Sequence, residues 1–193
     1  RLYHQRGKID GTAWCATRWR GRRVAQNPMD LLAIARIIQE QDDPRLLVEI
    51  GTGEGGSAAF WHDAGARVLT IDLVFGKPTN GVLDLAGDSC SAGIVEQVRD
   101  WTLGNAAVII LDGDHHATTV AQELLFYASM IRLGGYLIVC DTHFNGHPID
   151  PAFGPGPWEA VDAFLAERDD FVRDRDIEPM LTFNPGGYLR RVR

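Results

Sequence analysis

Cysteine is scarce in this chain. Only Cys15, Cys90 and Cys140 occur among 193 residues, far apart and without a CxxC pair. An odd number of separated cysteines argues against a disulfide framework, which needs paired residues and an oxidising compartment. We therefore expect the protein to work in a reducing cytoplasm.

Long apolar runs and an excess of positive charge are also missing. No stretch approaches the roughly 20 apolar residues that span a bilayer, and no secretory leader pattern opens the sequence. The net charge of −7 has the wrong sign for wrapping nucleic acid. Residues 18–23 (RWRGRR) form a local basic cluster that suits either an anionic ligand or a solvated loop. We expect no transmembrane segment and no nucleic-acid partner.

The composition is that of an ordinary globular protein, with 45% hydrophobic and 23% charged residues. A length of 193 residues suits one domain with a sizeable core. No repeat or linker divides the chain, so residues 1–193 are expected to form a single domain. Residues 1–26 show no clear period and are expected to cover that domain.

Apolar strands alternate with helical patterns over most of the chain. A helix is expected to begin at Asn27-Pro28, because asparagine caps helices and proline suits the first helical position. Further helices are expected at 57–64, 92–101, 118–132 (ended by Gly134-Gly135) and 158–167, and strands at 46–50, 67–71, 82–85, 106–111 and 136–139. This order predicts an α/β fold with a mostly parallel sheet and helices on both faces.

The last part of the chain has a different pattern. The stretches 171–175, 181–183 and 187–192 favour strands, and Asn184-Pro185-Gly186-Gly187 is typical of a turn. We expect the chain to close with an antiparallel hairpin joined to the parallel sheet.

The glycine-rich turn after the first of these strands is the strongest ligand signal. The apolar run 46–50 leads into Gly51-Thr52-Gly53-Glu54-Gly55-Gly56-Ser57. Glycine permits a positive φ and a close approach of the backbone to a ligand, and the first N–H groups of the next helix would face that ligand. The spacing fits the GxGxxG of dinucleotide-binding proteins and equally the GxGxG of S-adenosylmethionine (SAM) methyltransferases.

Acidic residues follow the predicted strands. Five successive strands end near Glu49, Asp72, Asp88, Asp112 and Asp141. Ligands of parallel α/β sheets bind outside the carboxyl ends of the strands, so these side chains are expected to meet at one site. Asp72 suits the ribose hydroxyls of either cofactor.

Three features favour SAM over a nicotinamide dinucleotide. Glu49 can order the loop beside a cationic ligand, Asp88-Ser89 suits contacts with adenine, and the closing hairpin is not expected of a dehydrogenase half. We therefore expect the SAM site to comprise the loop and the neighbouring strand ends: Glu49, Gly51, Thr52, Gly53, Gly55, Ser57, Asp72, Asp88, Ser89 and Asp112.

A set of motifs spread over residues 8–193 resembles a known family. The motifs are Asn27-Pro28-Met29-Asp30, Glu49-Ile50-Gly51-Thr52-Gly53, Gly55-Gly56-Ser57, Leu111-Asp112-Gly113-Asp114-His115, Asp141-Thr142, the run 153–161 (FGPGPWEAV) and the run 184–189 (NPGGYL). They resemble the small bacterial O-methyltransferases labelled cephalosporin hydroxylase-like, which include rhamnosyl and other sugar O-methyltransferases. The resemblance implies a Rossmann-like methyltransferase fold with a seven-stranded sheet, and SAM-dependent methyl transfer to a hydroxyl, commonly assisted by Mg²⁺.

The resemblance also implies a metal site at the ends of two neighbouring strands. In the enzymes that this chain resembles, an acidic residue occupies the position of Asp112, and an acidic pair occupies the positions of Cys140 and Asp141. Cys140 departs from that pattern, because a thiol is a poor ligand for Mg²⁺. We expect Asp112, Asp141 and Thr142 to hold the ion, with Asp114 or His143 as substitutes.

A histidine is the expected general base. His115 follows Asp112 by three residues, as in the Asp-x-x-His of related sugar methyltransferases, and imidazole titrates near neutral pH. His143, directly after Asp141 and Thr142, is the main rival, and Asp112 completes the catalytic set.

The leading hypothesis is therefore a SAM-dependent O-methyltransferase for a rhamnosyl or mannose-type hydroxyl of a small molecule or oligosaccharide. An NAD-type oxidoreductase and a SAM-binding module without catalysis are the alternatives. A homodimer is also expected, since residues 1–26 need a surface to cover.

Overall fold

The computed structural model describes residues 17–74 and 78–193. Its centre is a seven-stranded sheet in the order β5-β4-β3-β6-β7-β9-β8. The strands are β3 (Leu46–Ile50), β4 (Arg67–Asp72), β5 (Val82–Ala86), β6 (Ala106–Leu111), β7 (Ile131–Val139), β8 (Phe171–Arg173) and β9 (Tyr188–Arg191). The helices are α2 (Pro28–Glu40), α3 (Gly56–Asp63), α4 (Ala92–Thr102), α5 (Ala117–Tyr127) and α6 (Pro157–Ala166).

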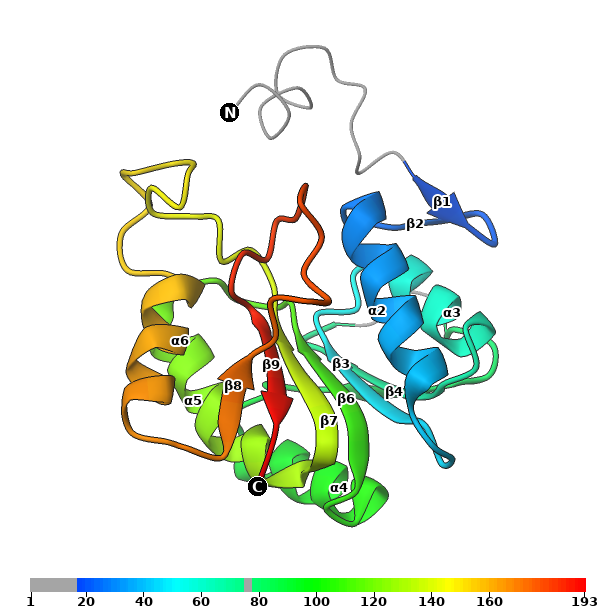
Figure 1. Cartoon of the computed structure of the whole chain (residues 1–193). Helices are drawn as coiled ribbons and strands as arrows, with labels where there is room; N and C mark the ends of the chain where they lie inside the picture. Colours follow the sequence, from blue (N-terminus) through cyan, green and yellow to red (C-terminus); the bar gives the residue numbers. More distant parts are fainter. Residues whose placement is uncertain (1–16, 75–77) are drawn as a thin grey trace.

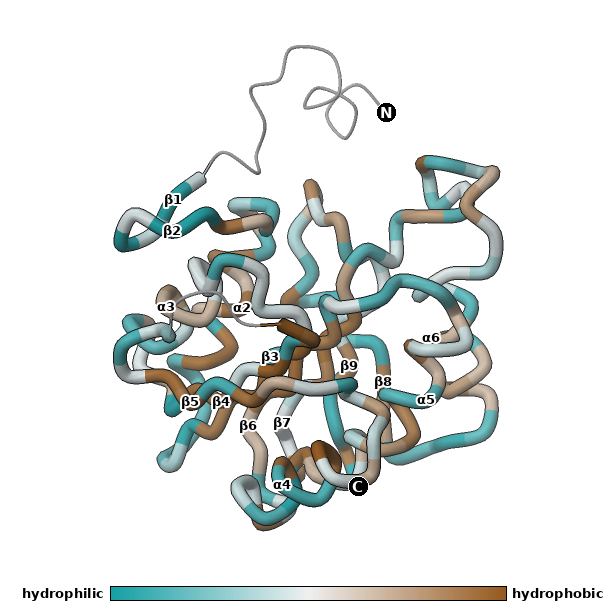
Figure 2. The backbone as a smooth tube through the Cα atoms, turned by 180° about the vertical axis from the view of Figure 1, so that it is seen from behind, coloured by the Kyte–Doolittle hydropathy of each residue, from teal (hydrophilic) through white to brown (hydrophobic). Residues whose placement is uncertain are grey.

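The sheet separates two layers of helices (Figure 1). One core cluster joins α2 and α3 to the sheet through side chains such as Ile34, Trp61 and Leu47. The other joins α4, α5 and α6 to the opposite face through Val98, Leu124 and Val161. Figure 2 shows the hydrophobic strands at the centre of the molecule, as expected of a parallel sheet buried on both faces.

Strands β3, β4, β5, β6 and β7 are mutually parallel, whereas β9 runs antiparallel to both β7 and β8. The predicted α/β fold and its antiparallel closing hairpin are thereby confirmed. The strand predicted at 181–183 is wrong, because those residues belong to the long connection between β8 and β9. Gly187 N–H donates to the Asn184 carbonyl at 2.9 Å, which closes the predicted turn at the start of β9.

The helix predicted at 118–132 is too long. Helix α5 ends at Tyr127, a single 3₁₀ turn follows at Ala128–Met130, and β7 already begins at Ile131. Gly134 and Gly135 lie inside β7, where the register against β6 shifts, so they form a strand irregularity rather than a helix end.

A short hairpin of β1 (Arg18–Trp19) and β2 (Arg22–Arg23) packs beside α3. Trp19 Nε1 donates to Asp63 at 2.8 Å, and Arg20 pairs with the same carboxylate. Arg22 donates to the carbonyl of Glu54 at 2.8 Å. The basic cluster thus binds groups of the protein itself, in α3 and in the glycine-rich loop. Most of the predicted cover segment, residues 1–16, lies outside the described residues.

Within the described residues, no helix combines the length and the apolar character needed to cross a membrane.

Candidate active site

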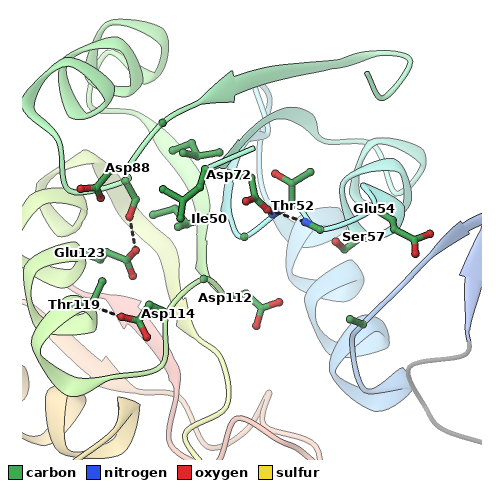
Figure 3. Close-up of a pocket in the computed structure, with 18 of the residues that line it drawn as sticks. Ile50, Thr52, Glu54, Ser57, Asp72, Asp88, Asp112, Asp114, Thr119 and Glu123 are labelled. Atoms are coloured by element: carbon green, nitrogen blue, oxygen red, sulfur yellow. Dashed lines mark hydrogen bonds between the residues drawn. The ribbon is translucent and has the colours of Figure 1, made fainter. Parts of the chain in front are cut away.

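A cleft of about 820 Å³ opens at the carboxyl ends of β3, β4, β5 and β6 (Figure 3). Its lining contains most of the residues predicted to bind the cofactor. These are Gly51, Thr52, Gly53, Ser57, Asp72, Asp88, Ser89 and Asp112, joined by Arg23, Ala25, Gln26, Ile50, Glu54, Ile71, Leu73, Gly87, Gly113, Asp114, Thr119 and Glu123. The topology therefore brings segments far apart in sequence to one edge of the sheet, as expected of this architecture.

Asp72 fixes the glycine-rich loop. Its Oδ2 accepts the backbone N–H groups of Thr52 at 3.0 Å and Gly53 at 2.9 Å (Figure 3). Two loop donors are satisfied by one carboxylate oxygen, which holds the loop against the end of β4. Asp72 thus lies in the cleft and orders the loop as well.

The loop glycines have different reasons to be glycine. A Cβ on Gly51, at φ +95°, would collide with the carbonyl of Asp112, and one on Gly55 would collide with the Thr79 side chain. A Cβ on Gly53 would meet no described atom within 4 Å. Gly51 and Gly55 are therefore required by the packing of the protein, and Gly53 is the glycine with open space beside it.

Glu49 is buried beneath the loop and does not line the cleft. Its carboxylate accepts Trp61 Nε1 at 2.8 Å and the Thr70 hydroxyl at 3.1 Å. Burial raises the pKa of Glu49 to about 7, against the opposing effect of hydrogen bonds from Ser57, Trp61 and Thr70. Glu49 therefore ties β3 to α3 and β4 beneath the loop. Its predicted role in binding the cofactor stays a prediction.

The far end of the cleft is built around Ser89. Asp88 Oδ1 accepts the N–H of Cys90 at 2.8 Å, and the Ser89 hydroxyl donates to Glu123 Oε1 at 2.6 Å. Glu123 Oε2 is buried without a hydrogen-bond partner among the described residues. Burial raises the pKa of Glu123 to about 7.

Glu123 was not predicted as a site residue, although the sequence contains a signal for it. It stands on α5 beside Val120, Leu124 and Tyr127, in the stripe that faces the core. A carboxylate in an apolar helical stripe is costly unless it is paired or functional. Asp30 stands in the apolar stripe of α2 in the same way, but its carboxylate is paired with Phe183 and Tyr188, whereas Glu123 lines the cleft.

Asp112, His115 and Asp141 come together where β6 and β7 end. One ligand atom from each lies within 4.8 Å of the others, an arrangement that can hold a metal ion. His115 Nε2 lies 3.2 Å from Asp141 Oδ2. Burial, and then the negative charges of Asp141 and Glu49, raise the pKa of Asp112 well above its usual range. A cation at this place would offset that repulsion.

Asp141 adopts a backbone conformation that is rare for residues other than glycine. It adopts a positive φ of 55°, and its N–H donates to the Asn184 side chain at 2.8 Å. Non-glycine residues in this conformation cluster at functional sites, where the surrounding structure maintains them. The turn before β9 therefore helps to orient Asp141.

A profile of the family described as Rhamnosyl O-methyltransferase/CmcI matches residues 12–192. This chain belongs to that family. The Rhamnosyl O-methyltransferase of Mycobacterium leprae is 30% identical to it over 194 residues, covering 92% of this chain and 84% of the relative. The predicted family is confirmed.

Two solved structures show the same fold. An O-methyltransferase from Bacillus cereus in complex with SAH aligns at a TM-score of 0.60 with 16% identity, covering 88% of this chain and 82% of that one. MycE, a methyltransferase from the mycinamycin biosynthetic pathway in complex with Mg and SAH, aligns at 0.58 with 14% identity, covering 86% and 48%. At these identities the likeness establishes the methyltransferase fold alone.

The family motif at 153–161 forms internal stacks. Phe153 stacks on both Phe144 and His116. Trp158 stacks on His147, and Arg173 lies 5.4 Å from its ring centroid. These contacts brace the loop after β7 against α6 beside the site.

Three predicted residues of the site have other partners. The Thr142 hydroxyl donates to the Pro185 carbonyl at 2.8 Å and is buried, so the structure does not bring it to the metal site. His143 is buried, and its Nδ1 donates to the Phe183 carbonyl at 2.5 Å. Asp114 lines the cleft, and although burial opposes the shift, hydrogen bonds from Thr119 and His116 lower its pKa to about 2.

Proposed function

We propose that this protein is a SAM-dependent O-methyltransferase that acts on a sugar hydroxyl, with rhamnosyl groups as the first acceptor class to test. The observation that carries the proposal is the placement of His115 and two carboxylates beside a nucleoside-sized cleft. The family and the name of the M. leprae relative support the acceptor class. SAH is the demethylated form of SAM, so the ligands of the B. cereus and MycE structures support the cofactor.

The cleft offers groups for each part of SAM. Asp72, at the end of β4, suits the ribose hydroxyls, and its bonds to Thr52 and Gly53 hold the loop against which SAM would lie. Asp88, Ser89 and Glu123 supply acceptors for the amino group of adenine at the other end. The open space at Gly53 lets the ligand approach the backbone.

Methyl transfer is an in-line displacement. A lone pair of the sugar oxygen forms the new C–O bond, the C–S bond breaks, and its electron pair stays on sulfur, which becomes the neutral thioether of SAH. The hydroxyl proton must be removed as the oxygen attacks. His115 is the base that the geometry favours, because it is half-buried beside the cleft edge whereas His143 is buried and bonded to a carbonyl.

Asp141 can set the tautomer of His115. When Nε2–H donates to Asp141 Oδ2, Nδ1 carries the lone pair that takes up the substrate proton. The same carboxylate then stabilises the imidazolium that forms. Asn184 in turn keeps the backbone of Asp141 in its unusual conformation.

The residues present fit a divalent cation. Asp112 and Asp141 offer hard oxygen ligands. Burial, and then the negative charges of Asp141 and Glu49, raise the pKa of Asp112, and a cation would offset both effects. A bound Mg²⁺ would lower the pKa of the sugar hydroxyl.

Calorimetry with SAM and with NAD tests the cofactor, with Asp72→Asn as the variant expected to weaken SAM binding. Tight NAD binding without SAM binding would favour an oxidoreductase and overturn the proposal. Transfer of label from SAM to rhamnosyl and mannosyl acceptors then separates an enzyme from a module that only binds SAM. SAM binding without transfer to any glycan would favour a module that binds SAM without catalysis.

A further inference from the structure

Gln26 reaches the centre of the metal site from outside the sheet. It directly precedes α2 and is only 5% exposed. Its Nε2 donates to Asp112 Oδ2 at 2.6 Å and lies 3.9 Å from Cys140 Sγ. The carboxamide therefore lies beside Asp112, the expected metal ligand after β6, and beside Cys140, which departs from the acidic pair of the family pattern.

The segment that carries Gln26 is firmly held. Asn27 Nδ2 donates to the Leu181 carbonyl at 2.8 Å, and its side chain caps α2 by accepting the N–H of Met29 at 2.9 Å. One turn later, buried Asp30 accepts the Phe183 N–H at 2.9 Å and the Tyr188 hydroxyl at 2.6 Å. These bonds join the start of α2 to the connection before β9, so the Gln26 amide has little freedom to leave Asp112.

Gln26 and Cys140 together differ in charge and in ligand type from an acidic residue at position 140. A carboxylate there would add a negative charge and hard oxygen ligands for a cation. The thiol of Cys140 is a soft ligand that suits Mg²⁺ poorly. The Gln26 amide donates a hydrogen bond to the Asp112 carboxyl group without adding any charge, and a bond of this kind is stronger when the acceptor is ionised.

We propose that Gln26 is a positioning residue. Its amide holds the Asp112 carboxyl group in the orientation that a bound cation would otherwise help to fix. The site consequently binds divalent cations more weakly than a site with a carboxylate at position 140 would, and Asp112 keeps its orientation when no cation is bound. This inference rests on the proposed function only for its activity readout, because cation binding can be measured without any acceptor.

The first test measures binding of Mn²⁺, alone and without SAM, by electron paramagnetic resonance on the full chain. Gln26→Glu is nearly isosteric and places a third carboxylate beside Asp112, so Mn²⁺ affinity should rise at least about tenfold. Gln97→Glu, on the exposed face of α4, is the matched control for added charge and should leave the affinity unchanged. An affinity for Gln26→Glu equal to or below that of the wild type would overturn the proposal.

The second test uses Gln26→Leu, which replaces the amide side chain with an apolar one of similar size. Wild-type protein should retain methyl transfer in chelator, whereas Gln26→Leu should lose at least about tenfold in kcat there and recover on addition of Mn²⁺. The KM for SAM should stay within about twofold of the wild type.

Rescue by a cation separates positioning from a structural role, because a packing fault would not respond to Mn²⁺. Equal activity of Gln26→Leu and wild type in chelator would contradict the inference, as would complete loss of wild-type activity there. If no acceptor is methylated by any variant, the proposed function fails, while the Mn²⁺ titration of Gln26→Glu still decides the role of Gln26.

Discussion

Replacing Glu49 by glutamine should make the protein more stable above neutral pH. Glu49 is fully buried between β3, α3 and β4, and burial raises its pKa to about 7. Glutamine has the same shape, can accept the Trp61 N–H through its oxygen and can donate to Thr70 through its nitrogen. The substitution therefore removes a buried charge and keeps the contacts with Trp61 and Thr70.

The size of the effect follows from linkage between protonation and folding. The folded protein binds this proton more tightly than the unfolded chain, so wild-type stability falls as pH rises from about 4.5 to about 7 and is then constant. Each pKa difference of one unit corresponds to about 1.4 kcal/mol. Between pH 5 and pH 8 the loss from Glu49 alone amounts to roughly 2 to 3 kcal/mol.

Urea unfolding at pH 5 and pH 8 measures this. The free energy of unfolding of Glu49→Gln, minus that of the wild type, should increase by roughly 2 to 3 kcal/mol between the two pH values, since the other titrating groups cancel in the difference. Glu96→Gln, on the exposed surface of α4, is the control and should show no such trend. A difference for Glu49→Gln that does not vary with pH would refute the reasoning.

Three further predictions concern the site. His115→Ala should lower kcat by about 10²- to 10⁴-fold while calorimetry shows unchanged SAM affinity; full activity would transfer the role of base elsewhere. Gly51→Ala should cost at least about 2 kcal/mol in urea unfolding, because its Cβ would meet the Asp112 carbonyl at a positive φ; wild-type stability would contradict the packing argument. SAM affinity should increase up to about tenfold as pH rises through about 7, since ionised Glu123 accepts a hydrogen bond from adenine better than the acid does; calorimetry should find no such rise in Glu123→Gln, and an identical pH profile for the two proteins would exclude Glu123 from the adenine site.

Local signals in the sequence predicted the fold well. The apolar run at β3 and the glycines after it determine a strand and a turn without help from distant residues. The boundary between α5 and β7 was missed because Ile131 continues the apolar spacing of the helix, and only pairing with β6 makes it a strand. The strand predicted at 181–183 is absent for a similar reason, since the Thr182 hydroxyl and the Phe183 N–H bind Asp30 of α2 rather than a neighbouring strand.

The sequence allowed the prediction of those site residues that come at or just after the end of a parallel strand. Asp72, Asp88 and Asp112 line the cleft because every parallel strand delivers its last residue to the same edge. Gln26 reaches that edge from the segment before α2, and no pattern in the sequence indicates that its amide contacts Asp112. Thr142 follows Asp141 directly, yet the left-handed backbone at Asp141 and the bond to Pro185 turn its hydroxyl elsewhere.

The central claim is that the cleft holds SAM and that its methyl group passes to a sugar hydroxyl beside His115. The most direct measurement incubates the full chain with tritium-labelled SAM and a rhamnosyl glycoside, and then analyses the isolated glycoside for label and for the methylated position. We expect label on a single rhamnose oxygen with wild-type protein and its near-complete loss with His115→Ala. Label that is absent from the sugar while SAM is bound, or undiminished by His115→Ala, would contradict it.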